Sequence, residues 1–304
     1  VLFGDMPLEQ ALDTAKSFGL DAVEIGTGNY PGSAHCDPAA LLKSPAKLKA
    51  FANAVSSRGL EISGLSCHGN PLHPDPKIAS AHRKAQRNTI LLAEKLGIDT
   101  VITFSGCPGD GPKATRPNWV TCPWPDDYSA ILDWQWKQCV IPFWKEEVKF
   151  ARAHSVQHIS LEMHPGFVVY NPSPLLRLRE AVGEEISANF DPSHLFWQGI
   201  DPIAGLKMLG SAVSYVHAKD TRIDPRNTAT NGVLDTKSYL DEANRSWIFR
   251  TVGYGHGRSF WKDFVSTLRI IGYDRVISIE HEDSLMSTKE GLAKAVSFLR
   301  DVLI

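Results

Sequence analysis

Four residues of the types that bind metal ions or move protons lie in the second half of the chain, each beside a short apolar segment: Glu162, Asp191, His217 and Glu280. The first two steps between them are 29 residues (191 minus 162) and 26 residues (217 minus 191), about the length of one strand plus one helix. The third step is 63 residues (280 minus 217), which fits one such unit and a long insertion. The spacing therefore predicts that each residue lies at the end of its own strand.

Each of these residues alone has an ordinary explanation, because a polar residue at a strand end often caps a helix or anchors a loop. Asp191, for example, could cap the turn formed by residues 191–194. Three carboxylates in one poorly hydrated cavity would raise one another's pKa unless a cation neutralised them. Three carboxylates and one imidazole suit Mn²⁺, Mg²⁺ or Co²⁺, and Zn²⁺ stays open. The four together predict one divalent metal ion, with Mn²⁺ favoured.

Apolar runs alternate with amphipathic stretches along the whole chain, which is typical of strands alternating with helices. The expected strands are 1–3, 23–25, 61–67, 100–104, 159–162, 186–190, 213–217 and 276–280. The expected helices are 8–18, 45–58, 78–96, 128–154 (kinked or split at Pro142), 173–182, 202–209, 260–271 and 288–303. Eight such pairs predict an α/β fold, a (β/α)8 TIM barrel that forms a single domain over residues 1–304. A doubly wound open sheet is the rival, but no Gly-x-Gly-x-x-Gly turn follows an early strand.

Two connections are long, residues 105–127 after the fourth expected strand and residues 218–257 after the seventh. Barrel enzymes build their sites at the carboxyl ends of the strands, from the loops that follow them. We therefore expect both long loops on the active face, as lids or substrate walls.

Composition excludes some classes of partner and favours a compartment. The net charge is -2, which gives no electrostatic reason to expect nucleic acid or an anionic membrane. We find no apolar stretch long enough to span a bilayer and no secretory leader. The five cysteines are scattered without a Cys-x-x-Cys pair, so we expect free thiols in a reducing compartment, the cytoplasm.

Four segments, residues 161–164, 189–194, 215–220 and 279–281, resemble motifs of the xylose isomerase-like TIM barrels. That superfamily includes sugar phosphate isomerase/epimerases, ketose 3-epimerases, inosose dehydratases, hydroxypyruvate isomerases and endonuclease IV. The resemblance implies that the four residues bind one metal and that Glu162 and Glu280 also move the proton. It further implies that His194 and Arg222 contact substrate oxygens, although the spacing of Arg222 only approximates the family pattern.

The chain departs from the ketose epimerases at two places. His164 lies two residues after Glu162, is not mapped onto the epimerase pattern, and is assigned here to catalysis. The insertion at residues 224–255 is longer than in the small epimerases. Both departures bear on the substrate and the reaction.

Four further residues are predicted to contact substrate. His68 ends the third expected strand, Glu24 lies at the end of the second, and Lys219 follows His217. The fourth, Trp124, belongs to a group of aromatic residues that could stack on the apolar faces of sugars: Trp119, Trp124, Trp134, Trp136, Phe196 and Trp197. The alternative is that these rings pack the long loops or form an oligomer contact.

By this resemblance the chain is a metal-dependent sugar isomerase or epimerase that acts through an enediolate by proton transfer next to a carbonyl. One alternative is a metal-dependent lyase or dehydratase of keto sugars, including 3-keto C- or O-glycosides, acting as one subunit of a complex. Endonuclease IV-like activity is disfavoured because no basic surplus serves a phosphate backbone. The expected partners are a carbohydrate or keto sugar and either further copies of the chain or a small partner subunit.

Overall fold

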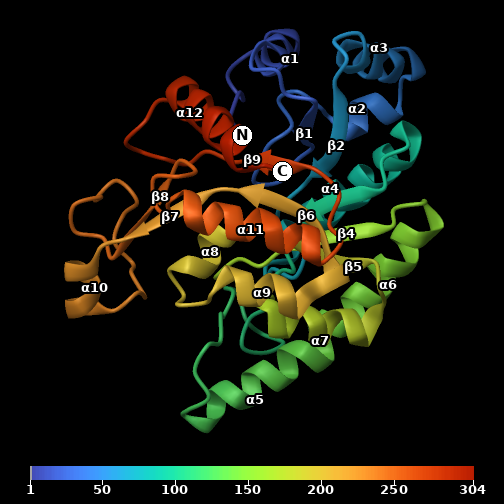
Figure 1. Cartoon of the computed structure of the whole chain (residues 1–304). Helices are drawn as coiled ribbons and strands as arrows, with labels where there is room; N and C mark the ends of the chain where they lie inside the picture. Colours follow the sequence, from blue (N-terminus) through green and yellow to red (C-terminus); the bar gives the residue numbers. More distant parts are fainter. Residues whose placement is uncertain (1) are drawn as a thin grey trace. The chain divides into compact units, whose positions relative to one another are not determined.

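The computed structural model describes residues 2–304 and divides them into two compact units. The first unit holds residues 3–189 and the second holds residues 190–304 together with Leu2. The division falls within one strand, β5 (Ile186–Phe190) (Figure 1). In the part of the chain that is described, no helix combines the length and the apolar character that crossing a membrane requires.

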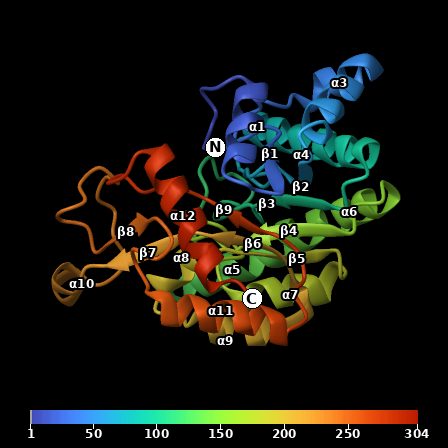
Figure 2. The ribbon, with the colours of Figure 1, turned by 45° about the horizontal axis from the view of Figure 1, so that its top comes forward.

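The first unit is built on parallel strands that follow one another in sequence order. They are β1 (Ala22–Gly26), β2 (Glu61–Ser66), β3 (Thr100–Thr103), β4 (His158–Glu162) and β5. Each pairs in parallel with the next, and Figure 2 shows β1 to β4 side by side. Because these strands are parallel, their carboxyl ends lie at the same edge of the sheet. Each connection between them must therefore cross back over the sheet and is long enough to hold a helix.

The crossovers of the first unit are mainly helical. Helix α1 (Leu8–Ser17) precedes β1. The crossovers between the strands hold α2 (Pro38–Leu42), α3 (Pro45–Ser56), α4 (Pro76–Leu96), α5 (Asp126–Trp134), the π-helix η1 (Gln135–Val140), α6 (Ile141–Ala153) and α7 (Pro172–Val182). Ser44 caps α3 by accepting from Lys47 N at 3.3 Å. The helix expected at 128–154 runs without a break from Asp126 to Ala153. Its hydrogen-bond pattern changes from α to π over Gln135–Val140, just before Pro142, the residue at which the sequence predicts a kink or a split.

The second unit contains a parallel strand pair and an antiparallel one. Its elements are α8 (Pro192–Phe196), α9 (Pro202–Leu209), the short 3₁₀ turn η2 (Gly210–Ala212), β6 (Val213–Ala218), β7 (Asp220–Ile223), α10 (Pro225–Asn231), β8 (Trp247–Arg250), α11 (Arg258–Ile270), β9 (Ile277–Ile279) and α12 (Thr288–Val302). Strand β6 pairs in parallel with β9, and β7 pairs antiparallel with β8. Figures 1 and 2 show α10 beyond the β7–β8 pair.

The two units supply five and two parallel strands, where the sequence predicted eight. The expected first strand, residues 1–3, is not observed: residues 2–5 form a turn in which Phe3 O accepts from Met6 N, and Val1 lies outside the described residues.

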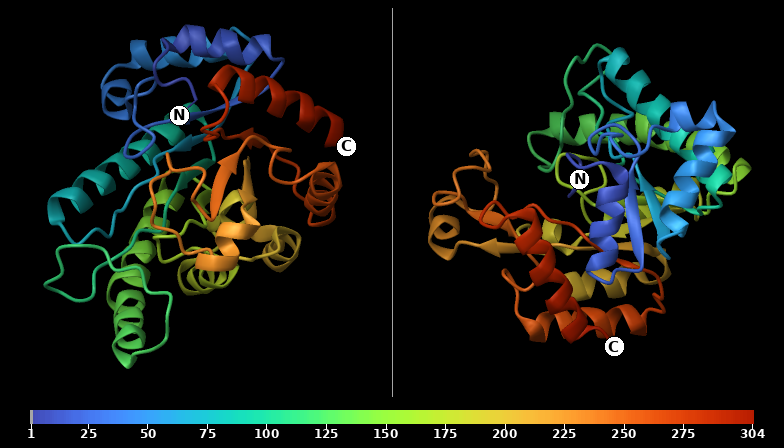
Figure 3. Two further views of the ribbon diagram at one scale, coloured as in Figure 1. Left: turned by 90° about the vertical axis from the view of Figure 1, so that its left-hand side faces the viewer. Right: turned by 90° about the horizontal axis from the view of Figure 1, so that it is seen from above.

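The two long connections differ from each other. Residues 104–125 have no helix or strand and lead into α5, none of whose residues is buried; Figure 3 shows this helix at the margin of the first unit. Residues 218–257, expected as a loop, instead contain β7, α10 and β8. These two short strands pack Trp247 and Phe249 against Trp197, which explains why so short a pair is stable.

Asp235 anchors the segment between α10 and β8. Its carboxylate, 1% exposed, accepts from Ser246 N at 2.6 Å, Lys237 N at 2.9 Å and Lys237 Nζ at 3.1 Å. Burial opposes ionisation, but these donors outweigh it and lower the pKa of Asp235 from 3.8 to about 2.

Because the folded-state pKa lies below the ordinary value, Asp235 stabilises the fold above about pH 4, and its contribution disappears as the pH falls toward 2. We expect Asp235→Ala to lower the Tm at pH 5 and to match the parent protein near pH 2. Thermal melts across this range measure the difference, and a difference that does not change with pH would contradict the assignment.

Candidate metal centre

Three of the four predicted ligands cluster within the second unit. Asp191 directly follows β5, His217 lies near the end of β6, and Glu280 directly follows β9. Each offers a ligand atom, and these atoms lie within 4.8 Å of one another. Within this cluster, His217 Nδ1 and Glu280 Oε2 are 2.9 Å apart. Two ligand atoms at right angles around an ion with bonds of about 2.1 Å are about 3 Å apart, so the spacing fits a metal site.

The two carboxylate oxygens of Asp191 contact different groups. Its Oδ1 accepts from Ser193 N at 2.8 Å and so caps α8, the explanation that the sequence left open. Its Oδ2 lies 3.3 Å from His194 Nε2 and 3.4 Å from Lys219 Nζ. The cap therefore orients the carboxylate and leaves the second oxygen directed at the cluster.

Glu162 is the last residue of β4 and is only 4% exposed. Its Oε2 accepts from Asn189 Nδ2 at 3.0 Å and lies 3.1 Å from His68 Nε2. Asn189 is also its partner in the β4–β5 register. His68, predicted to contact substrate, is thus a direct neighbour of the predicted acid/base residue.

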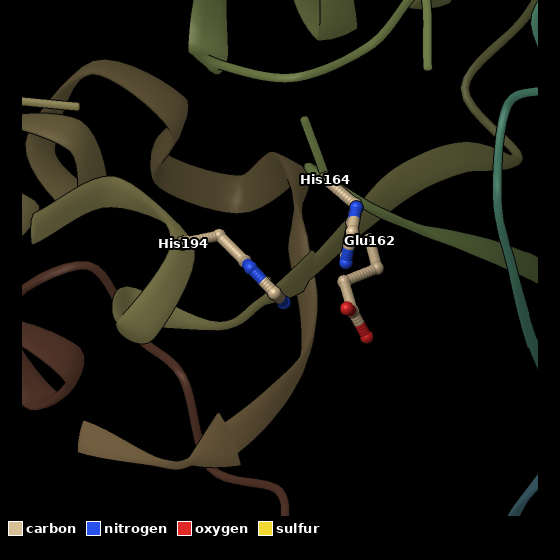
Figure 4. Close-up of side chains that lie close together, drawn as sticks. All are labelled: Glu162, His164 and His194. Atoms are coloured by element: carbon tan, nitrogen blue, oxygen red, sulfur yellow. The ribbon is translucent and has the colours of Figure 1, made fainter. Parts of the chain in front are cut away.

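Two aromatic residues that the sequence reasoning did not single out, Phe104 and Phe167, pack beside His68 and His164 in the first unit. Phe104 packs edge-on against His68 at 4.6 Å, lies 4.9 Å from the ring of His164, and stacks on Phe167 at 4.2 Å between centroids. His164 also offers a nitrogen within 4.8 Å of a Glu162 oxygen. Figure 4 shows the side chains of Glu162 and His164 close together. Phe104 directly follows β3, and that position was the available signal.

Lys219 carries the positive charge of the second-unit cluster. Its side chain is 2% exposed and lies near Asp191, Glu280 and Glu282, at 3.4, 3.2 and 2.8 Å. Two of these carboxylates, Asp191 and Glu280, also lie close to an imidazole, His194 and His217 respectively. Carboxylate oxygens and an imidazole nitrogen are ligands that divalent metal ions bind, so the donor set fits a metal ion.

Asp220 directly follows Lys219 and is fully buried. Its Oδ1 accepts from Thr221 N at 2.9 Å and lies 2.8 Å from His256 Nδ1. Its Oδ2 accepts from Gly253 N, Gly255 N and His256 N at 3.0, 3.1 and 2.9 Å, and from Trp261 Nε1 at 3.3 Å. Asp220 thus gathers the whole turn before α11 around one carboxylate.

The remaining predicted substrate residues lie in less enclosed surroundings. Arg222 is exposed on β7, and Trp124 is 74% exposed ahead of α5. Glu24 is half-buried in the third of five positions of β1, so it is not at the strand end as expected. Their contacts with substrate stay predictions.

Several other aromatic residues of the predicted stacking group pack within the protein. Trp136 is buried under the guanidinium of Arg177, and Trp197 stacks on Trp247 at 4.6 Å. For these rings the structure favours the alternative, loop and core packing, over a sugar platform.

The comparisons with known proteins place the chain in a family. The model of the xylose isomerase-like TIM barrel matches residues 12–302, so the chain belongs to this family. The TIM-barrel fold and the resemblance seen in the sequence are thereby confirmed. Among curated proteins, the chain is 41% identical over 302 residues to the uncharacterized protein YfiH of Bacillus subtilis. The matched region covers 99% of this chain and 96% of that protein.

Solved structures with low identity share the fold. A probable 3-DHS dehydratase, AsbF of Bacillus anthracis, has a TM-score of 0.66 at 15% identity and covers 96% of this chain and 92% of its own. A xylose isomerase-like TIM barrel protein of Mycobacterium smegmatis in complex with magnesium has a TM-score of 0.64 at 18% identity, and the match covers 99% of this chain and 92% of that one. D-psicose 3-epimerase of Clostridium cellulolyticum H10 with D-tagatose has a TM-score of 0.61 at 13% identity, and the match covers 97% of this chain and 93% of that one.

Proposed function

We propose that the chain is a divalent-metal-dependent sugar isomerase or epimerase, and that Glu162, Asp191, His217 and Glu280 hold one metal ion, Mn²⁺ in the first place. The observation that carries this proposal is the cluster of Asp191, His217 and Glu280, whose ligand atoms lie within 4.8 Å of one another beside the Lys219 ammonium. Oxygen-rich ligands with one imidazole favour Mn²⁺, Mg²⁺ or Co²⁺, and Zn²⁺ would also fit.

The chain itself supports the inclusion of Glu162. Glu162 and Asn189 are register partners, and Asn189 donates to the Glu162 carboxylate. Asp191 follows Asn189 by two positions, and its backbone is still extended, with φ -102° and ψ 107°. Alternate residues of a strand face the same side and are about 7 Å apart along it. Glu162 and Asp191 are therefore expected on one side of the sheet at neighbouring levels.

In the proposed reaction Glu162 and Glu280 carry the proton. One carboxylate removes it from the carbon next to the substrate carbonyl, and the other returns it to the opposite face or to the next carbon. The bound metal would supply Lewis-acid polarisation of the carbonyl. Asn189 donates to Glu162 Oε2, and His68 Nε2 lies 3.1 Å from the same oxygen, so these two residues orient the carboxylate that would carry the proton.

One observation favours a second candidate, a lyase or dehydratase of keto sugars. His164 offers a ring nitrogen near the Glu162 carboxylate, so the first unit holds a third group able to move a proton. Elimination needs such a group, because a leaving oxygen must be protonated as it departs. The same arrangement would serve 3-keto glycosides, whether the chain acts alone, as copies of itself or with a small partner subunit.

Product analysis distinguishes these candidates. Metal-free protein is prepared with a chelator, supplied with Mn²⁺, and incubated in D₂O with free ketoses, sugar phosphates and 3-keto glycosides. We expect an epimer or isomer that carries deuterium at the exchanged carbon, no turnover after chelation, and recovery with Mn²⁺. Release of an aglycone or water without an epimer would replace the isomerase by the lyase, and full activity of the chelated protein would refute the metal.

A further inference from the structure

The ammonium group of Lys219 contacts three carboxylates. The predicted contact of Lys219 with substrate would require one of its N–H donors to bind a substrate oxygen instead. Its Nζ contacts Glu282 Oε2 at 2.8 Å, Glu280 Oε1 at 3.2 Å and Asp191 Oδ2 at 3.4 Å, and lies 4.5 Å from the ring centre of Phe249. A lysine ammonium has three N–H donors. A substrate oxygen would therefore have to displace one of these carboxylates.

The contacts of Lys219 also fix how the predicted ligands present their oxygens. In Glu280 the oxygens are divided, Oε1 toward Lys219 and Oε2 toward His217 Nδ1. In Asp191, Oδ1 accepts from Ser193 N and Oδ2 faces Lys219 Nζ. This division favours one oxygen from Glu280 as a ligand, because the other is held by the ammonium.

We propose that Lys219 is a positioning residue of the metal centre, which sets the charge and the orientation of its ligands, and that Glu282 moderates the charge of Lys219. The inference rests on the proposed function, since it presupposes the metal. Glu282 is 44% exposed and was not among the predicted ligands, but it makes the shortest of the three contacts. It therefore draws the ammonium away from the two ligand carboxylates.

Opposite effects on metal binding follow from this arrangement. Lys219→Met removes a positive charge that lies beside two ligands, so Mn²⁺ should bind at least about fivefold more tightly. Glu282→Gln removes the carboxylate that shares that charge, so Mn²⁺ should bind about threefold more weakly. A residue that only contacted substrate would change neither affinity in the absence of substrate.

Isothermal titration of each chelated variant with Mn²⁺, without substrate and at pH 8, measures these affinities. Lys207→Met, an exposed lysine on α9, is the matched control and should leave the Kd unchanged. At saturating Mn²⁺, Lys219→Met should lower kcat more than it raises KM, because Glu280 loses its fixed orientation.

An unchanged Mn²⁺ Kd in Glu282→Gln, or in a folded Lys219→Met, would overturn the proposal. Glu282→Gln keeps the test decisive if Lys219→Met fails to fold, because Glu282 is half-exposed. Failure of the parent protein to bind Mn²⁺ at all would instead refute the proposed function, so the two failures are distinguishable.

Discussion

Glu280→Gln is expected to lower kcat/KM at least about a thousandfold and to weaken Mn²⁺ binding at least about a hundredfold. The first figure follows because a positioned acid or base contributes about 10² to 10⁴ in rate. The second follows because even residues that only support metal ligands cost about 10- to 100-fold in affinity when they are changed. The amide keeps the size of the side chain but cannot carry the proton or the negative charge.

The partners of Glu280 make this variant informative. Its carboxylate lies 2.9 Å from His217 Nδ1 and 3.2 Å from Lys219 Nζ, so the amide disturbs a ligand and the local charge together. Glu180→Gln, an exposed glutamate on α7, is the control and should retain activity and affinity. Measurements are steady-state rates with the substrate found by product analysis and calorimetric titration with Mn²⁺. Retention of more than a tenth of the parent activity would contradict the role of Glu280.

Asp220→Asn is expected to lower the free energy of unfolding by about 3–5 kcal/mol. The parent carboxylate accepts from four backbone N–H groups, of Thr221, Gly253, Gly255 and His256, and from the indole of Trp261. An amide would turn one of these acceptors into a donor and leave N–H groups without a partner in a buried site. The crowding around Gly255, where a Cβ would lie 2.3 Å from Thr221 O, leaves little room for relaxation.

Thermal unfolding tests this expectation directly. We expect the Tm of Asp220→Asn to fall by about 10 °C, given roughly 2–4 °C per kcal/mol in chains of this order of size. Asp263→Asn replaces an exposed aspartate on the neighbouring α11 and should shift the Tm by less than about 1 °C. A drop of less than about 2 °C in Asp220→Asn would mean that the turn before α11 does not depend on this carboxylate.

The alternation of strands and helices was predictable from the sequence because both signals are local. Helix α9 begins and ends where its periodicity indicates, at Pro202 and Leu209. Ser44 and Pro45 mark the start of α3 by capping chemistry that needs no tertiary information. The strand ends that carry Glu162 and His217 follow from the same apolar patterns.

The features that were missed depend on contacts between distant parts of the chain. Most hydrogen-bond donors to Asp220 lie at residues 253–261, more than thirty positions later in the chain, and no local pattern around Asp220 predicts them. Phe104 belongs to the candidate site only because its ring contacts those of His68 and His164, which are distant from it in sequence. The turn at residues 2–5 and the β7–β8 pair are too short for periodicity to separate strand from loop.

The central claim is that Glu162, Asp191, His217 and Glu280 hold one divalent ion. Crystals grown with Mn²⁺ and measured at the manganese absorption edge test it most directly, because the anomalous signal locates the ion without reference to activity. We predict one strong peak within about 2.4 Å of an oxygen of each carboxylate and a nitrogen of His217. A peak that lies elsewhere, or one that leaves out Glu162 or Glu280, would contradict this account.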